Sequence, residues 1–266
     1  MTSVGPTAGE LQGRIVLVSG GTQGVGAAVA RAAVIAGASV VVTGRRVAVG
    51  EAAVAELWAL GSEDARFIPA DITDVEQARS SVRQTVEEFG RIDCLVNAAG
   101  LTSRGTLLDT TPELFDQHVA VNLRGPFFLM QAAVEDMRRR GEPGTIVNVI
   151  TMSAHGGQPY LAPYVAAKAG LVGLTRNAAH AHRWDRIRIN GVNIGWTDTE
   201  GEDAIQRRSH GAGDDWRELA GKTLPMGRLG QVDDAAALVV LLLSDRSGVV
   251  TGAVVDWDQQ VVGAYD

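Results

Sequence analysis

Apolar and polar positions divide the chain into short apolar runs separated by longer Ala-rich stretches. The runs are continuously apolar and rich in Val and Ile, which is typical of parallel strands covered on both faces. We expect strands at 14–19, 39–43, 65–69, 94–97, 145–150, 187–192 and 253–256. We expect helices at 24–36, 49–60, 75–88, 112–141, 164–182 and 232–244. Because crossovers between parallel strands are right-handed, the series predicts an α/β fold: a doubly wound, seven-stranded parallel sheet with helices on both faces.

Length and composition limit the class of protein. The 266 residues are 45% apolar and 21% charged, as in globular proteins, and no linker or repeat interrupts the series. Residues 11–266 are therefore expected to form one domain, and residues 1–10 a flexible leader. A formal net charge of −7 argues against general binding of nucleic acid. The one cysteine, Cys94, excludes an internal disulfide and favours a reducing compartment, so we expect a cytoplasmic protein.

The longest apolar run, 235–243, is shorter than the roughly 20 residues that a membrane span needs, so no membrane partner is expected. No cluster of side chains suggests a metal site either. His180 and His182 are two residues apart on an expected helix and therefore face different ways.

A glycine-rich turn follows the first expected strand. Its sequence is Ser19-Gly20-Gly21-Thr22-Gln23-Gly24-Val25-Gly26, and an Ala-rich helix comes next. Glycines let the backbone turn tightly and approach a pyrophosphate, which then sits at the positive end of the helix. The turn lacks the Lys-Ser/Thr end of a P-loop, which disfavours nucleotide hydrolysis. A turn without a ligand is the alternative, but its position between strand and helix favours a dinucleotide.

The end of the second expected strand bears on the choice of cofactor. An acid there would hold the ribose hydroxyls of NAD, but the sequence has Gly44 followed by Arg45 and Arg46. A guanidinium suits a 2′-phosphate, so NADP is favoured over NAD. The alternative is that both arginines are ordinary surface charges.

Tyr164 and Lys168 lie four residues apart in an expected helix and therefore share one face. A tyrosine with a pKa near 10 needs that pKa lowered by about 3 units, roughly 4 kcal/mol, to act as a base at neutral pH. A neighbouring lysine and the positive charge of an oxidised nicotinamide would together supply that. An exposed pair without a role is the alternative, and the glycine turn upstream argues against it.

The glycine turn, Asn97-Ala98-Ala99-Gly100, Asn122, and Tyr164 with Lys168 together resemble the short-chain dehydrogenase/reductase family over about residues 11–258, in its NADP-preferring type. The resemblance implies a Rossmann fold, a hydride transfer between nicotinamide and a carbonyl or alcohol carbon, and Tyr164 as general acid/base. It implies that Lys168 lowers the pKa of Tyr164 and that Asn122 orders a water on a proton path. The implied cofactor-binding residues are Gly20, Thr22, Gln23, Gly24, Val25, Gly26, Arg45, Arg46, Asp71, Ile72, Asn97, Ala98, Ala99, Gly100, Tyr164, Lys168, Ile194, Gly195, Thr197 and Thr199.

Several positions depart from the family pattern. Thr151 stands where the family has a serine that binds the reacting oxygen, and Ser153 is an alternative donor. We rank Thr151 first and expect both side chains on one face of an extended segment. Ala98 replaces an asparagine that braces the neighbouring strand. Ile194 stands where proline is common.

The polar stretch 197–224, here called the lid, follows the strand that would flank the nicotinamide and is expected to cover the substrate; a pair of surface helices is the alternative. Candidate substrate residues follow the carboxyl ends of strands: Ser153, His155, Tyr160 and Trp196, with Arg104 and Gln158 beside them. They suit a small polyol or sugar slightly better than a cyclic ketone. The alternative for His155 is that it is a loop residue without a role in binding.

Two rival functions remain open from the sequence. The chain would bind NADP as a sensor or scaffold without turnover, or would catalyse an epimerisation or dehydration without net oxidation of the cofactor. Intact Tyr164, Lys168 and Asn122 favour hydride transfer. The apolar helix 235–243 and the last strand resemble the family's tetramer-forming segment, so a homotetramer is expected.

Overall fold

Seven parallel strands form the central sheet of the computed structural model, which describes residues 7–263. Their order across the sheet is β3-β2-β1-β4-β5-β6-β9. Crossovers run outward in opposite directions from β1 and β4, which makes the gap between their carboxyl ends the switch point of a doubly wound fold. The strands are β1 (Ile15–Ser19), β2 (Ser39–Gly44), β3 (Arg66–Pro69), β4 (Cys94–Asn97), β5 (Gly144–Val149), β6 (Ile187–Ile194) and β9 (Val254–Trp257).

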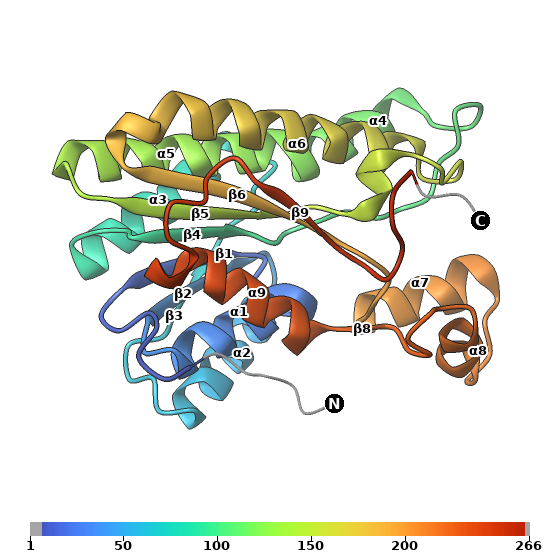
Figure 1. Cartoon of the computed structure of the whole chain (residues 1–266), viewed down its shortest axis with the longest axis horizontal. Coiled ribbons are helices and arrows are strands. Elements are labelled where there is room, and N and C mark those ends of the chain that lie inside the picture. The colour runs from blue at the N-terminus through green and yellow to red at the C-terminus, as the bar shows by residue number, and fades with distance from the viewer. Residues whose placement is uncertain (1–6, 264–266) are drawn as a thin grey trace.

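Helices cover both faces of the sheet (Figure 1), as the sequence predicted. One apolar core lies between the sheet and α1 (Gly24–Ile35), α2 (Val47–Ala59) and α9 (Val232–Leu243). The other core lies between the sheet and α3 (Val75–Phe89), α5 (Gly125–Arg140) and α6 (Ala162–His182). The inner strands of the sheet are therefore buried from both sides, which explains the absence of polar alternation in their sequences.

The stretch 112–141, predicted as one helix, is interrupted. It comprises α4 (Pro112–Val119), a π-helical turn η1 (Ala120–Arg124) and α5. Pro126 has no N–H to donate to the carbonyl oxygen of Asn122, so the α-helical pattern cannot continue there. The N–H of Gly125 instead bonds the carbonyl of Ala120, five residues earlier. This widened turn carries Asn122.

The lid contains two helices at the carboxyl end of β6, α7 (Glu200–His210) and α8 (Trp216–Lys222), seen in orange in Figure 1. The Thr199 hydroxyl caps α7 by accepting a hydrogen bond from the N–H of Glu202, and Gly211 ends it in a left-handed conformation. A two-stranded sheet, β7 (Thr197–Asp198) and β8 (Gly230–Gln231), closes the base of the lid.

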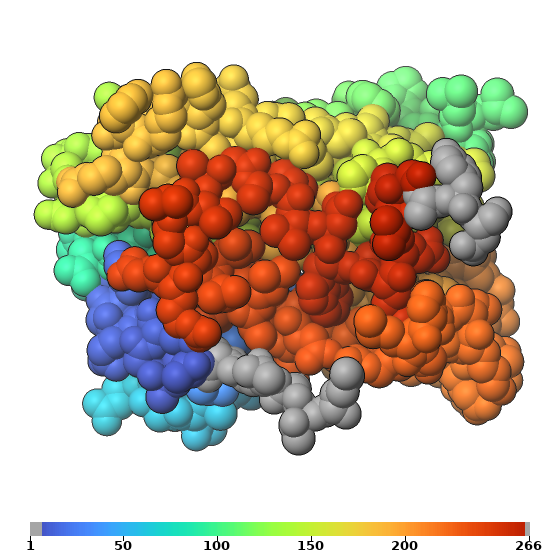
Figure 2. Space-filling model, in the orientation of Figure 1, coloured from blue at the N-terminus to red at the C-terminus, as the bar shows by residue number. Residues whose placement is uncertain are grey.

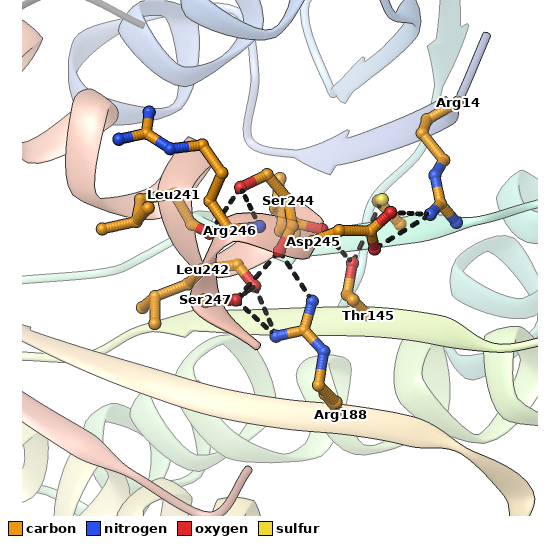
Figure 3. A network of polar contacts seen from close by, with 11 residues as sticks. Arg14, Thr145, Arg188, Leu241, Leu242, Ser244, Asp245, Arg246 and Ser247 are labelled. Carbon is orange, nitrogen blue, oxygen red and sulfur yellow. Dashed lines mark hydrogen bonds and ion pairs between the residues drawn. The ribbon is translucent and has the colours of Figure 1, made fainter. Parts of the chain in front are cut away.

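Short helical turns complete the described elements: η2 (Met152–His155), η3 (Arg183–Asp185) and η4 (Asp245–Ser247). The segment from α9 to β9, in red, covers the middle of the face seen in Figure 2. At the end of the sheet away from the lid, Arg188 of β6 anchors this segment (Figure 3). Its guanidinium donates to the carbonyl oxygens of Leu242 at 3.0 Å and Ser244 at 2.9 Å, and to the Ser247 hydroxyl at 2.6 Å.

The first six residues of the predicted leader lie outside the described residues. Within the remainder, Glu10 forms an ion pair with Arg246, and Leu11 is buried. No helix in the described range 7–263 has the length and apolarity to cross a membrane.

Candidate active site

The glycine turn packs tightly against the loop that follows β4. A Cβ atom on Gly20 would lie 2.6 Å from backbone atoms of Ala99, and one on Gly26 would lie 2.2 Å from the carbonyl oxygen of Gly20. Gly20 and Gly24 also have positive φ angles, of 75° and 54°. Side chains are therefore excluded at Gly20 and Gly26, and the two loops meet at the switch point.

The amino end of α1 is suited to an anion. Gln23 occupies the N-cap position but forms no side-chain capping bond, and the first turn has no acidic residue. The free N–H groups and the helix dipole would attract a phosphate. Ser19 Oγ and Thr43 Oγ1 are buried nearby on β1 and β2 and have no hydrogen-bond partner among residues 7–263. These features fit the pyrophosphate and ribose of a dinucleotide.

Both predicted NADP-selecting arginines lie at the exposed end of β2. The Arg46 guanidinium bonds the Gln23 side chain, whereas Arg45 has no hydrogen bond within the described chain. Thr22 is close to this corner, since a Cβ on Gly44 would meet its side chain at 3.1 Å. Val25, the remaining predicted residue of the turn, packs its side chain against the core beneath α1.

Asp71 and Ile72 follow β3. The Asp71 carboxylate accepts hydrogen bonds from the N–H and hydroxyl of Thr73, at 2.9 and 2.8 Å. Ile72 is buried. A Cβ atom on Gly125 would lie 2.9 Å from the carbonyl oxygen of Ile72. A side chain at position 125 would therefore push this loop away from the sheet.

The loop after β4 begins with a buried chain of amides. Asn97 Nδ2 donates to Asn148 Oδ1 at 2.8 Å, and Asn148 Nδ2 donates to the Thr175 hydroxyl at 2.9 Å. These two hydrogen bonds join β4 to β5 and α6. They form although Ala98 stands where the family pattern has a second asparagine. The N–H of Ala98 bonds the carbonyl of Ser19 at 2.9 Å, which aligns this loop with the glycine turn.

Tyr164 and Lys168 lie on one face of α6, as predicted, and both side chains are buried. The Lys168 ammonium is 5.9 Å from the centroid of the Tyr164 ring. Burial raises the pKa of Tyr164 to about 12, against the opposite effect of the Thr151 hydroxyl. Burial also lowers the pKa of Lys168 to about 8. Burial of Tyr164 therefore acts against the lowering of its pKa that the sequence predicted.

Three side chains after β5 form a chain of hydrogen bonds. Thr151 Oγ1 donates to Ser153 Oγ at 3.2 Å, and Ser153 Oγ donates to Gln158 Oε1 at 2.7 Å. Both residues are buried, and the Thr151 hydroxyl is close enough to the Tyr164 phenol to lower its pKa. The sequence predicted that Thr151 and Ser153 share one face of an extended segment. That prediction of an extended segment was wrong, because residues 152–155 form the 3₁₀ turn η2. Thr151 caps that turn by accepting from the N–H of Ser153.

Asn122 is fully buried, and its side chain is saturated with hydrogen bonds. Its amide pairs with both backbone groups of Leu101, each at 3.0 Å. Its Nδ2 also lies 3.2 Å from Nδ1 of His118. The side chain of Asn122 therefore holds the loop after β4, next to Gly100, whose added Cβ would lie 3.6 Å from Asn122 Oδ1.

The segment after β6 has a close approach at Gly195. Its N–H bonds the carbonyl of Trp257 at 2.9 Å, and a Cβ there would lie 2.1 Å from Asp258. The Thr197 hydroxyl bonds the carbonyl of Gly195, whereas Ile194 packs partly against the core. These contacts turn the chain from β6 into the lid.

Two aromatic contacts connect the lid to the rest of the site. The Arg104 guanidinium lies over the Tyr160 ring at 5.3 Å and is 3.2 Å from Nε2 of His210, at the end of α7. Trp196 and Trp216 stack with centroids 6.2 Å apart and line a hollow with part of α8. The structure thus brings Tyr160 and Trp196 to the lid.

His155 lies elsewhere. Its Nε2 is 3.0 Å from Asp256 Oδ1 on β9, and that carboxylate also accepts from Asn193 at 2.7 Å. The ring joins η2 to the edge strand, so contact with a substrate would require it to leave this partner.

Comparison with known proteins agrees with this geometry. A family model described as enoyl-(acyl carrier protein) reductase matches residues 20–259. The chain belongs to the short-chain dehydrogenase/reductase family. L-rhamnose 1-dehydrogenase (NAD(P)(+)) of Sphingomonas sp. is 36% identical, over 91% of this chain and 94% of that protein. NADP-dependent (R)-specific alcohol dehydrogenase of Lentilactobacillus kefiri is 33% identical, over 91% and 94%. The crystal structure of a short-chain type dehydrogenase/reductase from Mycobacterium marinum superposes with a TM-score of 0.87 at 30% identity, covering 96% of this chain and 97% of that one.

Sequence reasoning missed three side chains in this short-chain dehydrogenase/reductase site. They are His118, Asn148 and Glu202, whose carboxylate accepts hydrogen bonds from the Trp196 indole at 2.9 Å and from Gln206 at 2.7 Å. A signal existed for His118, which lies four residues before Asn122 on the same helical face. No comparable signal marked Glu202, because its contact with Trp196 depends on how the lid folds.

Proposed function

We propose that this chain is an NADP-dependent oxidoreductase that moves a hydride between nicotinamide and a carbonyl or secondary alcohol carbon of a small substrate. One observation carries the proposal: the buried Tyr164 phenol lies beside the Thr151 hydroxyl and on one face of α6 with Lys168. A bound nicotinamide would supply the hydride acceptor or donor. The glycine turn, the uncapped end of α1 and the close approach at Gly195 support its binding.

Tyr164 is the proposed acid/base. During carbonyl reduction its phenol would donate a proton to the substrate oxygen, and during alcohol oxidation the phenolate would accept one. Thr151 would orient that oxygen, with Ser153 and Gln158 fixing the Thr151 hydroxyl through the observed hydrogen bonds. Lys168, whose pKa is near 8, would favour the phenolate by its positive charge once a ligand occupies the site.

The proposed substrate is polar, such as a polyol or sugar, with a cyclic ketone as the second class. Gln158, Arg104 and Glu202 offer hydrogen-bond donors and acceptors around Tyr164, and both Arg104 and Glu202 are close enough to influence its pKa. The relative from Sphingomonas, an L-rhamnose dehydrogenase by name, supports a sugar. Arg45 supports NADP over NAD by its exposed charge at the end of β2.

The test is Tyr164→Phe, with Trp184→Phe, at an exposed position of η3, as the control. Nucleotide oxidation or reduction is followed across a panel of sugars, polyols and cyclic ketones with NADP(H) and NAD(H). We expect Tyr164→Phe to lose about 10²–10⁴-fold in kcat and the control to retain catalysis. Ordinary turnover by Tyr164→Phe would refute the acid/base role. Tight binding of NADP without turnover of any panel member by the unaltered chain would favour the sensor or scaffold function.

We also propose a homotetramer. β9 is an edge strand of the sheet and is only half-buried within one chain, and Val249 beside it is 94% exposed. Light scattering after size-exclusion chromatography would measure the assembly, and a monomeric mass would refute it.

A further inference from the structure

His118 is a fully buried histidine to which the proposed proton transfer assigns no role. It lies at the end of α4, one helical turn before Asn122, with no exposed surface. Its ring contacts Tyr164 edge-on, with centroids 6.1 Å apart and planes at 70°. A buried imidazole must find hydrogen-bond partners for both nitrogens, and here those partners belong to the site.

The hydrogen bonds around Asn122 determine which nitrogen of His118 carries a proton. The N–H of Leu101 donates to Oδ1 of Asn122, so Nδ2 is the donor end of that amide. Nδ2 faces Nδ1 of His118 at 3.2 Å, and Nδ1 must therefore accept. The proton then sits on Nε2, 3.1 Å from the carbonyl oxygen of Ser103, which can only accept. One form satisfies every partner: a neutral ring protonated on Nε2.

The surroundings also disfavour a charged ring. Within the described chain, the hydrogen bonds of His118 involve no carboxylate. Tyr164 on α6 contacts the His118 ring, Lys168 lies beyond the Tyr164 ring, and Arg104 follows Ser103 in the chain. Near neutral pH these groups are uncharged or positive, so none stabilises an imidazolium. Burial lowers the pKa of His118, and the hydrogen bond with Ser103 acts in the opposite direction.

We propose that His118 is a positioning residue of the hydride-transfer site and that it acts only as this neutral form. His118 and Asn122 together hold Leu101 and Ser103, alternate residues of the loop after β4. The same loop contacts the glycine turn, and the ring of His118 supports Tyr164. Protonation would place two donors against each other at Nδ1 and Nδ2, and the loop would lose that attachment. This inference rests on the proposed function.

Two variants separate hydrogen bonding from simple packing. His118→Val removes the hydrogen bonds with Ser103 and Asn122. His118→Gln keeps a side-chain amide that can both accept and donate a hydrogen bond, and this amide does not titrate. His180→Gln, at an exposed position of α6, is the control. We expect His118→Val to fold but to lose about ten- to a hundredfold in kcat, with little change in KM, because the reacting groups are misaligned. We expect His118→Gln to retain most activity at neutral pH and to lose the acidic limb of the unaltered enzyme's kcat profile for carbonyl reduction, the direction in which Tyr164 works protonated and imposes no acidic limb of its own.

A folded His118→Val variant with kcat within about twofold of the unaltered enzyme would overturn the inference. So would an acidic limb that persists unchanged in His118→Gln. A second readout needs no activity: imidazole ¹⁵N shifts of the free protein, with His118→Gln used to assign the signal. We expect a neutral ring protonated on Nε2, with a pKa below the ordinary histidine value of about 6.5. A charged ring at neutral pH, or a proton on Nδ1, would refute the inference even if hydride transfer is confirmed. Absence of hydride transfer with the expected ¹⁵N shifts would instead refute the proposed function.

Discussion

The ammonium group of Lys168 donates a hydrogen bond of 2.8 Å to the carbonyl oxygen of Val149. This contact ties α6 to the last residue of β5, two residues before Thr151. Lys168 is 4% exposed and has no carboxylate partner in the described structure, so its charge is held by a neutral carbonyl. The cost of burying that charge appears in its pKa, which falls to about 8.

Replacing Lys168 by Met should therefore change how stability depends on pH. Between about pH 8 and the ordinary lysine pKa of about 10.4, the unfolded chain binds this proton more tightly than the folded chain. Stability of the unaltered protein thus rises with pH across that interval through Lys168, and the variant lacks this rise. Urea unfolding at about pH 7.5 and about pH 9.5 should show a relative gain of about 2 kcal/mol for the unaltered protein. Equal pH dependence of the two proteins would contradict the expectation.

Ionisation of Tyr164 should depend on the oxidised nucleotide. Because burial raises its pKa to about 12, the free protein should show no tyrosinate from Tyr164 below about pH 10. A positive nicotinamide near the phenol should lower that pKa into a measurable range. The ultraviolet difference between the unaltered protein and Tyr164→Phe, with and without NADP⁺, measures this directly. If nucleotide leaves the difference spectrum unchanged, the charge does not act on this phenol.

Arg45→Ala should weaken NADP much more than NAD. Arg45 is exposed at the end of β2 and has no hydrogen bond among residues 7–263, whereas Arg46 is engaged with Gln23. Loss of one charge-assisted contact with a 2′-phosphate should raise Kd for NADP about tenfold and leave NAD within about twofold. Arg46→Ala serves as the neighbouring comparison. Equal weakening of both nucleotides by Arg45→Ala would exclude selection by this side chain.

His210→Ala should loosen the lid. His210 accepts a hydrogen bond from Arg104 and contacts the Tyr160 ring, with centroids 5.6 Å apart. Loss of these partly exposed contacts should speed amide exchange in 200–210 by about three- to fivefold. Arg208→Ala on the same helix is the control, since Arg208 is exposed and its side chain forms no hydrogen bond in the described structure. Unchanged exchange in His210→Ala would show that other contacts hold α7.

Arg188→Met should reduce stability without altering the active site. The Arg188 guanidinium donates to two carbonyl oxygens at the end of α9 (Figure 3). Arg188 lies near the start of β6, at the opposite end of that strand from the lid. Methionine keeps much of the apolar stem but removes the hydrogen bonds that the charged guanidinium donates, so that within the described chain the two carbonyl oxygens keep only their contacts with Ser247. This loss should cost about 2–3 kcal/mol. Thermal unfolding should shift downward by about 5–10 °C, and kcat at low temperature should stay close to that of the unaltered enzyme. A shift no larger than that of Arg208→Met would contradict this role.

Much of the site could be predicted because its elements have local signatures. The continuous apolar runs predicted the seven strands, and the i, i+4 spacing correctly predicted that Tyr164 and Lys168 share one helical face. The break at η1 was missed although Pro126 signalled it, because the apolar pattern on either side suggested a single helix.

Contacts between distant segments were decided by the tertiary structure. His118 meets Ser103 and Asn122 because α4 packs against the loop after β4, and His155 bonds Asp256 because β9 pairs beside β6. The sequence by itself determined the strand and helix series, the glycine turn and the paired phenol and ammonium, since periodicity and backbone freedom act over a few residues. Only folding decided which polar groups meet across the sheet, because those partners lie tens of residues apart and depend on how whole elements pack.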